Sequence, residues 1–149
     1  MGGAMAAGDR AGRMRESAEM VMGEFDGDLR TALDLPVAAA RKALMKFRMI
    51  GEPSADRILA INRKAKRVPL DSNGLRVVQR LGLAAAKKDY RASYRAAQEA
   101  LIAHAPARTA WLVEAGALLR QHGQELCKAT KPKCGECPLS GECPASLVA

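Results

Sequence analysis

Aromatic residues are scarce in this chain of 149 residues, which has one Trp, two Tyr and two Phe. Aliphatic side chains and alanine must therefore fill its core, and a hydrophobic content of 48% is enough for one domain, or one and a part. No apolar run approaches the roughly 20 residues of a membrane span, so we expect no membrane partner. The N-terminus lacks the pattern of a signal peptide, and we expect a cytoplasmic protein.

Acidic residues are also few relative to basic ones. The chain has 24 Lys and Arg against 16 Asp and Glu, which gives a net charge of +8. A basic balance of this size suits a polyanion, most often nucleic acid. The alternative is a soluble basic protein without such a partner.

Strand-like alternation is missing, and apolar residues recur at helical spacing almost throughout the chain. The pattern predicts an all-α fold, a helical bundle that includes two short helices joined by a tight turn at about 44–60. We expect a disordered N-terminus over 1–10, a helical core over 11–121, and a cysteine loop and tail over 122–149. Asp34 is expected to cap the helix that has Pro36 in its first turn. The last long helix is predicted to begin at Pro106 and to carry the apolar residues Trp111, Ala115, Leu118 and Leu119.

Cysteine is absent until the C-terminal loop, which holds all four: Cys127, Cys134, Cys137 and Cys143. They are separated by six, two and five residues. In a reducing compartment this arrangement favours metal ligation over disulfides and indicates an iron–sulfur cluster or a zinc ion. Zinc modules usually have two Cys-x2-Cys pairs and this loop has one. A zinc-binding interaction domain nevertheless stays as an alternative.

Three lysines lie between the first two cysteines: Lys128, Lys131 and Lys133. A basic loop held by a metal can contact phosphate. A solvated basic loop is an equally good interpretation.

The two short helices at 44–60 enclose a turn with Gly51 at its tip and Ser54 just after it. Such a unit can direct backbone N–H groups and a helix N-terminus at a phosphate. Such a hairpin is more often plain helix packing. Further on, Asp71 lies on a short loop where a helix begins. Most aspartates at such positions are N-caps, and the functional alternative is a catalytic carboxylate held by the helix terminus.

Together these features resemble the endonuclease III branch of the helix-hairpin-helix/Gly-Pro-Asp DNA glycosylases. The cysteine spacing is similar to that family's iron–sulfur loop, with His122-Gly123 before it and Cys137-Pro138-Leu139 within it. The segment Phe47–Ala55 resembles the family's hairpin, and Asp71 follows Pro53 by eighteen residues, as the family's aspartate follows its hairpin. The resemblance covers about Arg13 to Pro144.

The resemblance implies a base-excision enzyme that flips a damaged or mismatched base from double-stranded DNA and cuts its N-glycosidic bond. It assigns the catalytic role to Asp71 and a 4Fe–4S cluster to the four cysteines. DNA contacts are implied for Arg48, Met49, Gly51 and Ser54 in the hairpin, and for the three lysines of the cysteine loop. In a prokaryote the protein would be nucleoid-associated.

The chain departs from the family in three ways. Pro53 stands where bifunctional members have a lysine nucleophile, so lyase activity is not expected. Met49 replaces a hairpin glycine, and a positive φ there would be costly. No N-terminal helices of the family are found before Arg13, so we expect a marginal monomer, self-association, or completion by a partner chain. A non-catalytic iron–sulfur DNA-binding paralogue, or a fragment, is the alternative function, and the lesion is not specified.

Overall fold

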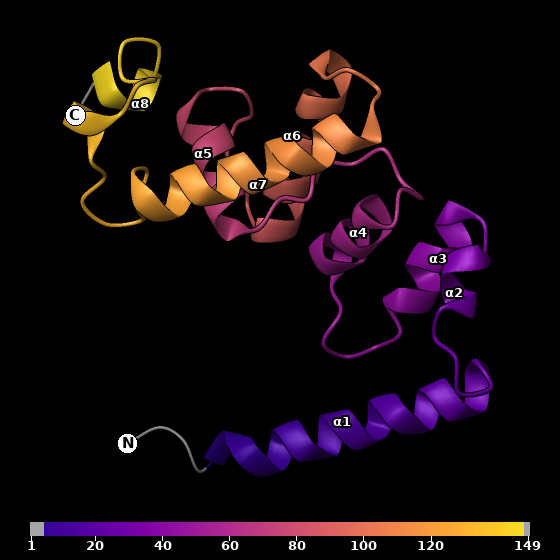
Figure 1. The fold of residues 1–149 in the computed structure, drawn as a ribbon. Helices are drawn as coiled ribbons and strands as arrows, with labels where there is room; N and C mark the ends of the chain where they lie inside the picture. The colour runs from indigo at the N-terminus through magenta and orange to yellow at the C-terminus, as the bar shows by residue number, and fades with distance from the viewer. Residues whose placement is uncertain (1–4, 148–149) are drawn as a thin grey trace. The chain divides into compact units, whose positions relative to one another are not determined.

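The computed structural model describes residues 5–147, which form α-helices and one short 3₁₀-helix (Figure 1). The elements are α1 (Met5–Glu24), α2 (Thr31–Asp34), α3 (Val37–Leu44), α4 (Glu52–Ile61), α5 (Ser72–Arg80), α6 (Tyr90–His104), α7 (Thr109–Glu125), η1 (Cys134–Glu136) and α8 (Pro144–Leu147). No strand occurs among the described residues, which confirms the expected all-α fold. None of their helices is both long enough and apolar enough to span a membrane. The chain divides into two compact units, residues 1–55 and 56–149.

A small apolar core holds the first unit together. Phe25, Ala32, Ala43 and Phe47 are buried, and the rings of the two phenylalanines stack with their centroids 6.2 Å apart. The chain turns after α1 at Gly27, whose φ of 80° is accessible to glycine without a steric penalty. Two of the chain's few aromatic residues therefore join the end of α1 to the residues after α3.

Helix starts in the first unit differ from the expected ones. The first helix already begins at Met5, so 5–10 is helical where we expected disorder, and 1–4 lies outside the described residues. Asp34 ends α2 and does not cap α3, whose N-cap residue is Pro36. The reason is Leu35, which is extended (φ −67°, ψ 156°), as a residue before proline prefers. This extended residue and Pro36 separate Asp34 from the first residue of α3.

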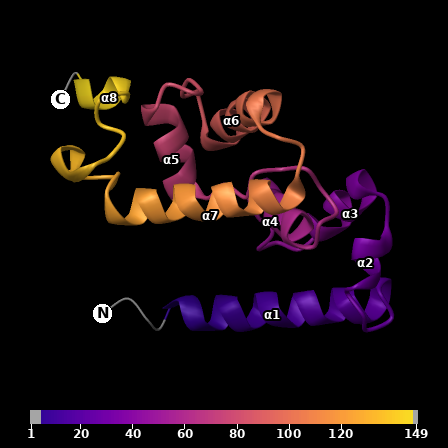
Figure 2. The same ribbon diagram turned by 45° about the horizontal axis from the view of Figure 1, so that its top comes forward.

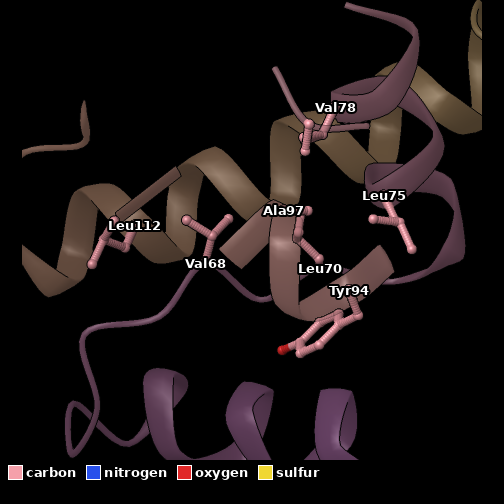
Figure 3. Close-up of a cluster of buried hydrophobic side chains, with 8 residues drawn as sticks. Val68, Leu70, Leu75, Val78, Tyr94, Ala97 and Leu112 are labelled. Atoms are coloured by element: carbon pink, nitrogen blue, oxygen red, sulfur yellow. The ribbon is translucent and has the colours of Figure 1, made fainter. Parts of the chain in front are cut away.

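A larger apolar core lies in the second unit, and Figure 3 shows most of its side chains. Its buried members are Val68, Leu70, Leu75, Val78, Ala84, Tyr94, Ala97 and Leu112. They come from the extended segment before α5, from α5, α6 and α7, and, for Ala84, from the loop between α5 and α6. Burying one such aliphatic side chain contributes about 1.5–3 kcal/mol. This core therefore fixes the segment that leads to Asp71 against three helices.

A buried polar network adjoins this core. The Tyr94 hydroxyl, which points away from the apolar side chains in Figure 3, donates to Asp56 Oδ2 at 2.9 Å. The Gln98 amide donates to the Val68 carbonyl at 2.5 Å, and its oxygen accepts from the Val68 N–H at 3.3 Å. Buried backbone groups need hydrogen-bond partners. Gln98 supplies both for Val68 and so secures the extended segment before Asp71.

Two glycines of α7 let the loop before α5 lie directly on that helix. A Cβ at Gly116 would come 2.7 Å from Pro69 Cδ, and a Cβ at Gly123 would come 2.7 Å from the Asn73 carbonyl oxygen. The two glycines are seven residues apart, which places them on the same face of the helix. α5 accordingly packs against α7, as both Figure 1 and Figure 2 show.

Of the apolar residues that we expected on α7, Leu119 packs against the core, but others lie on an exposed face. Trp111 and Leu118 are 39% and 59% exposed, whereas Leu112, Gly116 and Gly123 are buried. The close approach of the 69–73 loop selects the face with the smallest residues. A hydrophobicity pattern ranks glycine low, so it selects the neighbouring face with larger apolar side chains.

Candidate functional site

Asp71 stands at the N-cap position of α5. Its Oδ1 accepts a hydrogen bond from the Gly74 N–H at 2.8 Å, and its Oδ2 accepts one from Asn73 Nδ2 at 3.3 Å. The Nε of Arg120, on α7, lies 3.4 Å from the same Oδ2. The Asp71 side chain keeps 28% exposure. The carboxylate thus caps the helix through one oxygen and presents the other to an arginine and to solvent.

Tyr90, the first residue of α6, is within electrostatic range of Asp71. Burial raises the pKa of the Tyr90 phenol above its ordinary value, and the negative charge of Asp71 raises that pKa further. The side chain is still about half exposed. Carboxylate, guanidinium and phenol therefore share one partly open surface at the start of α5 and α6.

Arg76 ties α5 to the C-terminal end of α7. Its Nε donates to the Cys127 carbonyl at 2.9 Å, and its Nη2 donates to the Gly123 carbonyl at 2.7 Å. The same Nη2 donates to Asn73 Oδ1 at 3.0 Å, and Asn73 in turn contacts Asp71. These carbonyls belong to the last turn of α7 and the residues just after it. The guanidinium thus satisfies acceptors that a helix end leaves free.

Arg80, one turn further along α5, holds the beginning of the cysteine loop. It donates to the carbonyls of Lys128 at 2.6 Å and Ala129 at 3.2 Å, and Nη1 lies 3.4 Å from Cys127 Sγ. The Cys143 Sγ lies 3.3 Å from the carbonyl oxygen of Arg80 itself. Both ends of the cysteine loop therefore contact the last turn of the helix that Asp71 caps.

The four cysteines are free, partly buried, and line a single cavity of about 160 Å³. Its wall also includes the apolar residues Val77, Leu81 and Leu126, and His122, whose Nε2 is 3.6 Å from Cys137 Sγ. Among the described residues, no three His, Cys, Asp or Glu side chains are close enough to bind a single ion. Four thiols around one partly apolar cavity fit an iron–sulfur cluster, because such clusters are held by four thiolates.

The three lysines of the cysteine loop are all exposed. Lys131 adopts a positive φ of 52°, at the point where the loop turns. Lys133 forms an ion pair with Glu136 at 3.3 Å, and its backbone N–H donates to the Leu126 carbonyl. An exposed ion pair contributes only about 0–1 kcal/mol. It leaves the Lys133 ammonium free to exchange its carboxylate partner for another anion.

The hairpin residues belong to the first unit. Arg48, Met49, Gly51 and Ser54 are all exposed, around the turn between α3 and α4. Neither Met49 nor Gly51 has a positive φ, so the backbone cost that we expected at Met49 does not arise. A Cβ at Gly51 would make only an ordinary contact of 3.8 Å with Pro53. The turn therefore does not depend on glycine.

An acidic side chain lies at the start of α4. Glu52, the first residue of that helix, is buried and pairs with Arg41 at 2.7 Å. Pro53 follows it and has no backbone N–H. A carboxylate next to a helix N-terminus interacts favourably with the helix dipole. The positive end of α4 is thus partly neutralised, which leaves less of it for a phosphate.

Part of this site and the overall fold are similar to known proteins. The model of the iron–sulfur binding domain of endonuclease III matches residues 127–143. In this segment the chain is similar to endonuclease III. Its fold is similar to a solved structure titled as a trapped endonuclease III–DNA covalent intermediate, an estranged-adenine complex, with a TM-score of 0.67 and 22% identity. The similarity covers 87% of this chain and 55% of that one, so this chain spans about half the length of the solved endonuclease III chain. No curated protein matches the chain.

The structure also brings to the site residues that the sequence analysis missed. Arg76 and Arg80 are one helical turn apart, so they share a face of α5, and that much can be read from the sequence. Their partners lie about 50 positions away and are mostly backbone carbonyls, which carry no sequence signal. Arg120 was also missed, because its partner Asp71 is distant in the chain and no sequence pattern links the two residues.

Proposed function

We propose that this chain is a DNA base-excision glycosylase of the endonuclease III type, which hydrolyses the N-glycosidic bond of a flipped damaged or mismatched base. The observation that carries the proposal is Asp71, a partly exposed carboxylate at a helix start, joined through Asn73 and Arg76 to the iron–sulfur binding domain. Double-stranded DNA is the proposed partner, and the net charge of +8 supports it.

Asp71 would act as an ionised carboxylate close to C1′ of the flipped nucleotide. Positive charge develops on the sugar as the bond to the base breaks, and a fixed negative charge lowers the energy of that state. Alternatively, the carboxylate activates the attacking water. The cap to Gly74 fixes Oδ1, so Oδ2 is the oxygen that would face the sugar. The exposed side of the carboxylate supports this assignment.

Water would be the nucleophile in this reaction. Schiff-base chemistry requires an amine, and Pro53 at the hairpin position has none. The product would be an abasic site in an intact strand. We therefore propose a monofunctional glycosylase.

A 4Fe–4S cluster is the group that we propose for Cys127, Cys134, Cys137 and Cys143. When bound, it would serve to shape the loop and would supply no electron to base release. Lys128, Lys131 and Lys133 would then contact phosphates, as would the exposed hairpin residues Arg48, Met49, Gly51 and Ser54. Phosphate contacts of this kind position a protein on DNA without reading sequence.

The test is base release by anaerobically purified protein, with iron and sulfide content and visible absorbance measured on the same sample. A panel of lesion-containing and mismatched duplexes is incubated with the protein and analysed with and without alkali or heat. Strand breaks only after alkali or heat support a monofunctional glycosylase. Strand breaks without that treatment would show lyase activity and would contradict a monofunctional glycosylase. Colourless protein that contains zinc would contradict the cluster.

A second candidate is a non-catalytic iron–sulfur DNA-binding protein. The ion pair between Arg120 and Asp71 favours it, because the arginine partly neutralises the proposed catalytic carboxylate. The variant Asp71→Asn separates the two functions, because asparagine also caps helices but carries no charge. We expect base release to fall about 10²–10³-fold while duplex binding is retained. Wild-type protein that binds DNA and releases no base from any substrate would favour the second candidate.

A further inference from the structure

Arg120 is the cation closest to the candidate catalytic carboxylate, and the roles described above do not use it. Arg120 belongs to α7. This helix packs against α5 (Figure 2), the helix that Asp71 caps, because Gly116 and Gly123 allow a close approach. Its side chain is 44% exposed. The sequence gives no indication of the pairing, since the two residues are 49 positions apart.

The contact between Arg120 and Asp71 is loose. The Nε to Oδ2 distance of 3.4 Å exceeds the range of a typical N–H···O hydrogen bond. Ion pairs between partly exposed side chains contribute little to stability. A guanidinium has five N–H donors in a planar fork, and this contact uses one edge of it. The pair can therefore open at low cost.

The same contact opposes the role that we assign to Asp71. A carboxylate stabilises positive charge on a sugar only if its own charge is not already neutralised by a neighbouring cation. Arg120 lies against Oδ2, the oxygen that the helix cap leaves available. A nucleotide at Asp71 must therefore displace this guanidinium. It also brings phosphates on either side of its sugar, and arginine binds phosphate through two parallel hydrogen bonds.

We propose that Arg120 is a phosphate-binding residue that exchanges Asp71 for a phosphodiester flanking the flipped nucleotide. This inference rests on the proposed function, because it requires DNA at Asp71. In the free protein the arginine covers the carboxylate. In the complex it holds the backbone beside the nucleotide and leaves Oδ2 facing the sugar.

The experiment measures binding and does not depend on base release. Wild-type protein, Arg120→Gln and Arg108→Gln are titrated with a duplex that contains a tetrahydrofuran abasic analogue, across a series of salt concentrations. Arg108 is exposed, lies at the other end of α7 and undergoes the same change of charge. Each phosphate contact contributes about 0.9 to the slope of log affinity against log salt. Melting curves confirm that each variant folds.

We expect Arg120→Gln to reduce the magnitude of the slope by about one and Arg108→Gln to leave it unchanged. An unchanged slope and affinity in Arg120→Gln would overturn the proposal, and so would equal losses in the two variants. Failure of the wild-type protein to bind the duplex contradicts the proposed function itself. That failure is seen in the wild-type arm before any variant is compared.

A double-mutant cycle tests the exchange. If Asp71 competes with phosphate for Arg120, then Asp71→Asn raises duplex affinity by releasing the arginine. The gain should be at least about threefold larger with Arg120 present than in the Arg120→Gln background, a coupling of about 0.65 kcal/mol when the ratio is converted with RT. Equal gains in the two backgrounds would mean that Asp71 acts only through general repulsion of DNA, and the exchange would be wrong.

Discussion

At the scale of single residues, Asp71 is an observed helix cap and the catalytic residue that we propose, two roles that the sequence presented as alternatives. It is the N-cap of α5 through Oδ1, and its Oδ2 contacts Asn73 and Arg120. Capping and catalysis are compatible here because a carboxylate has two oxygens. The cap also explains why the position is well defined, since rotation of the side chain would cost the hydrogen bond to Gly74.

The charge of Asp71 should be measurable at Tyr90. The pKa of Tyr90 is raised by burial and then by Asp71, because a second negative charge nearby disfavours the phenolate. Asp71→Asn removes that charge, so we expect the pKa of Tyr90 to fall in the variant while remaining above its ordinary value of 10.0. An NMR titration of Cζ-labelled tyrosine measures this, with Tyr90→Phe to assign the signal. A pKa that does not change would place Tyr90 outside the Asp71 site.

At the scale of elements, α5 and α7 form the framework of the site. α5 begins at the candidate carboxylate and ends at the cysteine loop, where Arg76 and Arg80 bind backbone carbonyls. Hydrogen bonds to a charged group contribute about 1.5–3 kcal/mol each. The loop and the carboxylate are thus held by one rigid helix of nine residues.

Gly116→Ala tests the contact between α7 and the loop before α5. The added Cβ would lie 2.9 Å from the Pro69 carbonyl oxygen, so the loop or the helix must shift. We expect a loss of about 1–3 kcal/mol in unfolding free energy, measured by urea denaturation. Gly23→Ala is the matched control, because a Cβ at this helical glycine meets nothing within 4 Å. The control should be neutral or more stable by up to about 1 kcal/mol. Equal stability of the two variants would contradict the close approach.

At the scale of the whole molecule, the second unit leaves apolar surface uncovered. A groove of about 490 Å³ runs beside α7 and is lined by Leu101, Ala105, Trp111, Ala115 and Leu118, among others. Contiguous exposed apolar surface promotes association. This groove supports the expectation that the purified chain associates with itself or with a partner chain.

Sedimentation velocity at several protein concentrations tests self-association. We expect the wild-type chain to form concentration-dependent oligomers. Leu118→Lys should shift it toward monomer, because a charge in the groove opposes burial. Leu83→Lys is the control, since Leu83 is similarly exposed but does not line this groove. A wild-type chain that is monomeric at every concentration would contradict the prediction.

Local patterns in the sequence were sufficient for the helices, for the cysteine loop and for Asp71 as a cap. Each of these depends on interactions between residues close in the chain: helical hydrogen bonds, a loop short enough to bring four thiols together, and a side chain bonded to an N–H three positions on. The resemblance carried by the cysteine spacing is confirmed by the match to the endonuclease III iron–sulfur domain. The Asp34 cap failed because one extended residue before a proline intervened.

Only the tertiary structure decided which face of α7 is buried and which side chains surround Asp71. Gly116 and Gly123 are buried because another segment approaches, and no local pattern records that approach. Arg76 and Arg80 bind carbonyl oxygens, and every residue has one, so the sequence cannot mark the partner. The pairing of Arg120 with Asp71 likewise depends on how two helices distant in the chain are packed. The sequence therefore determined what is local, and packing decided every contact between distant residues.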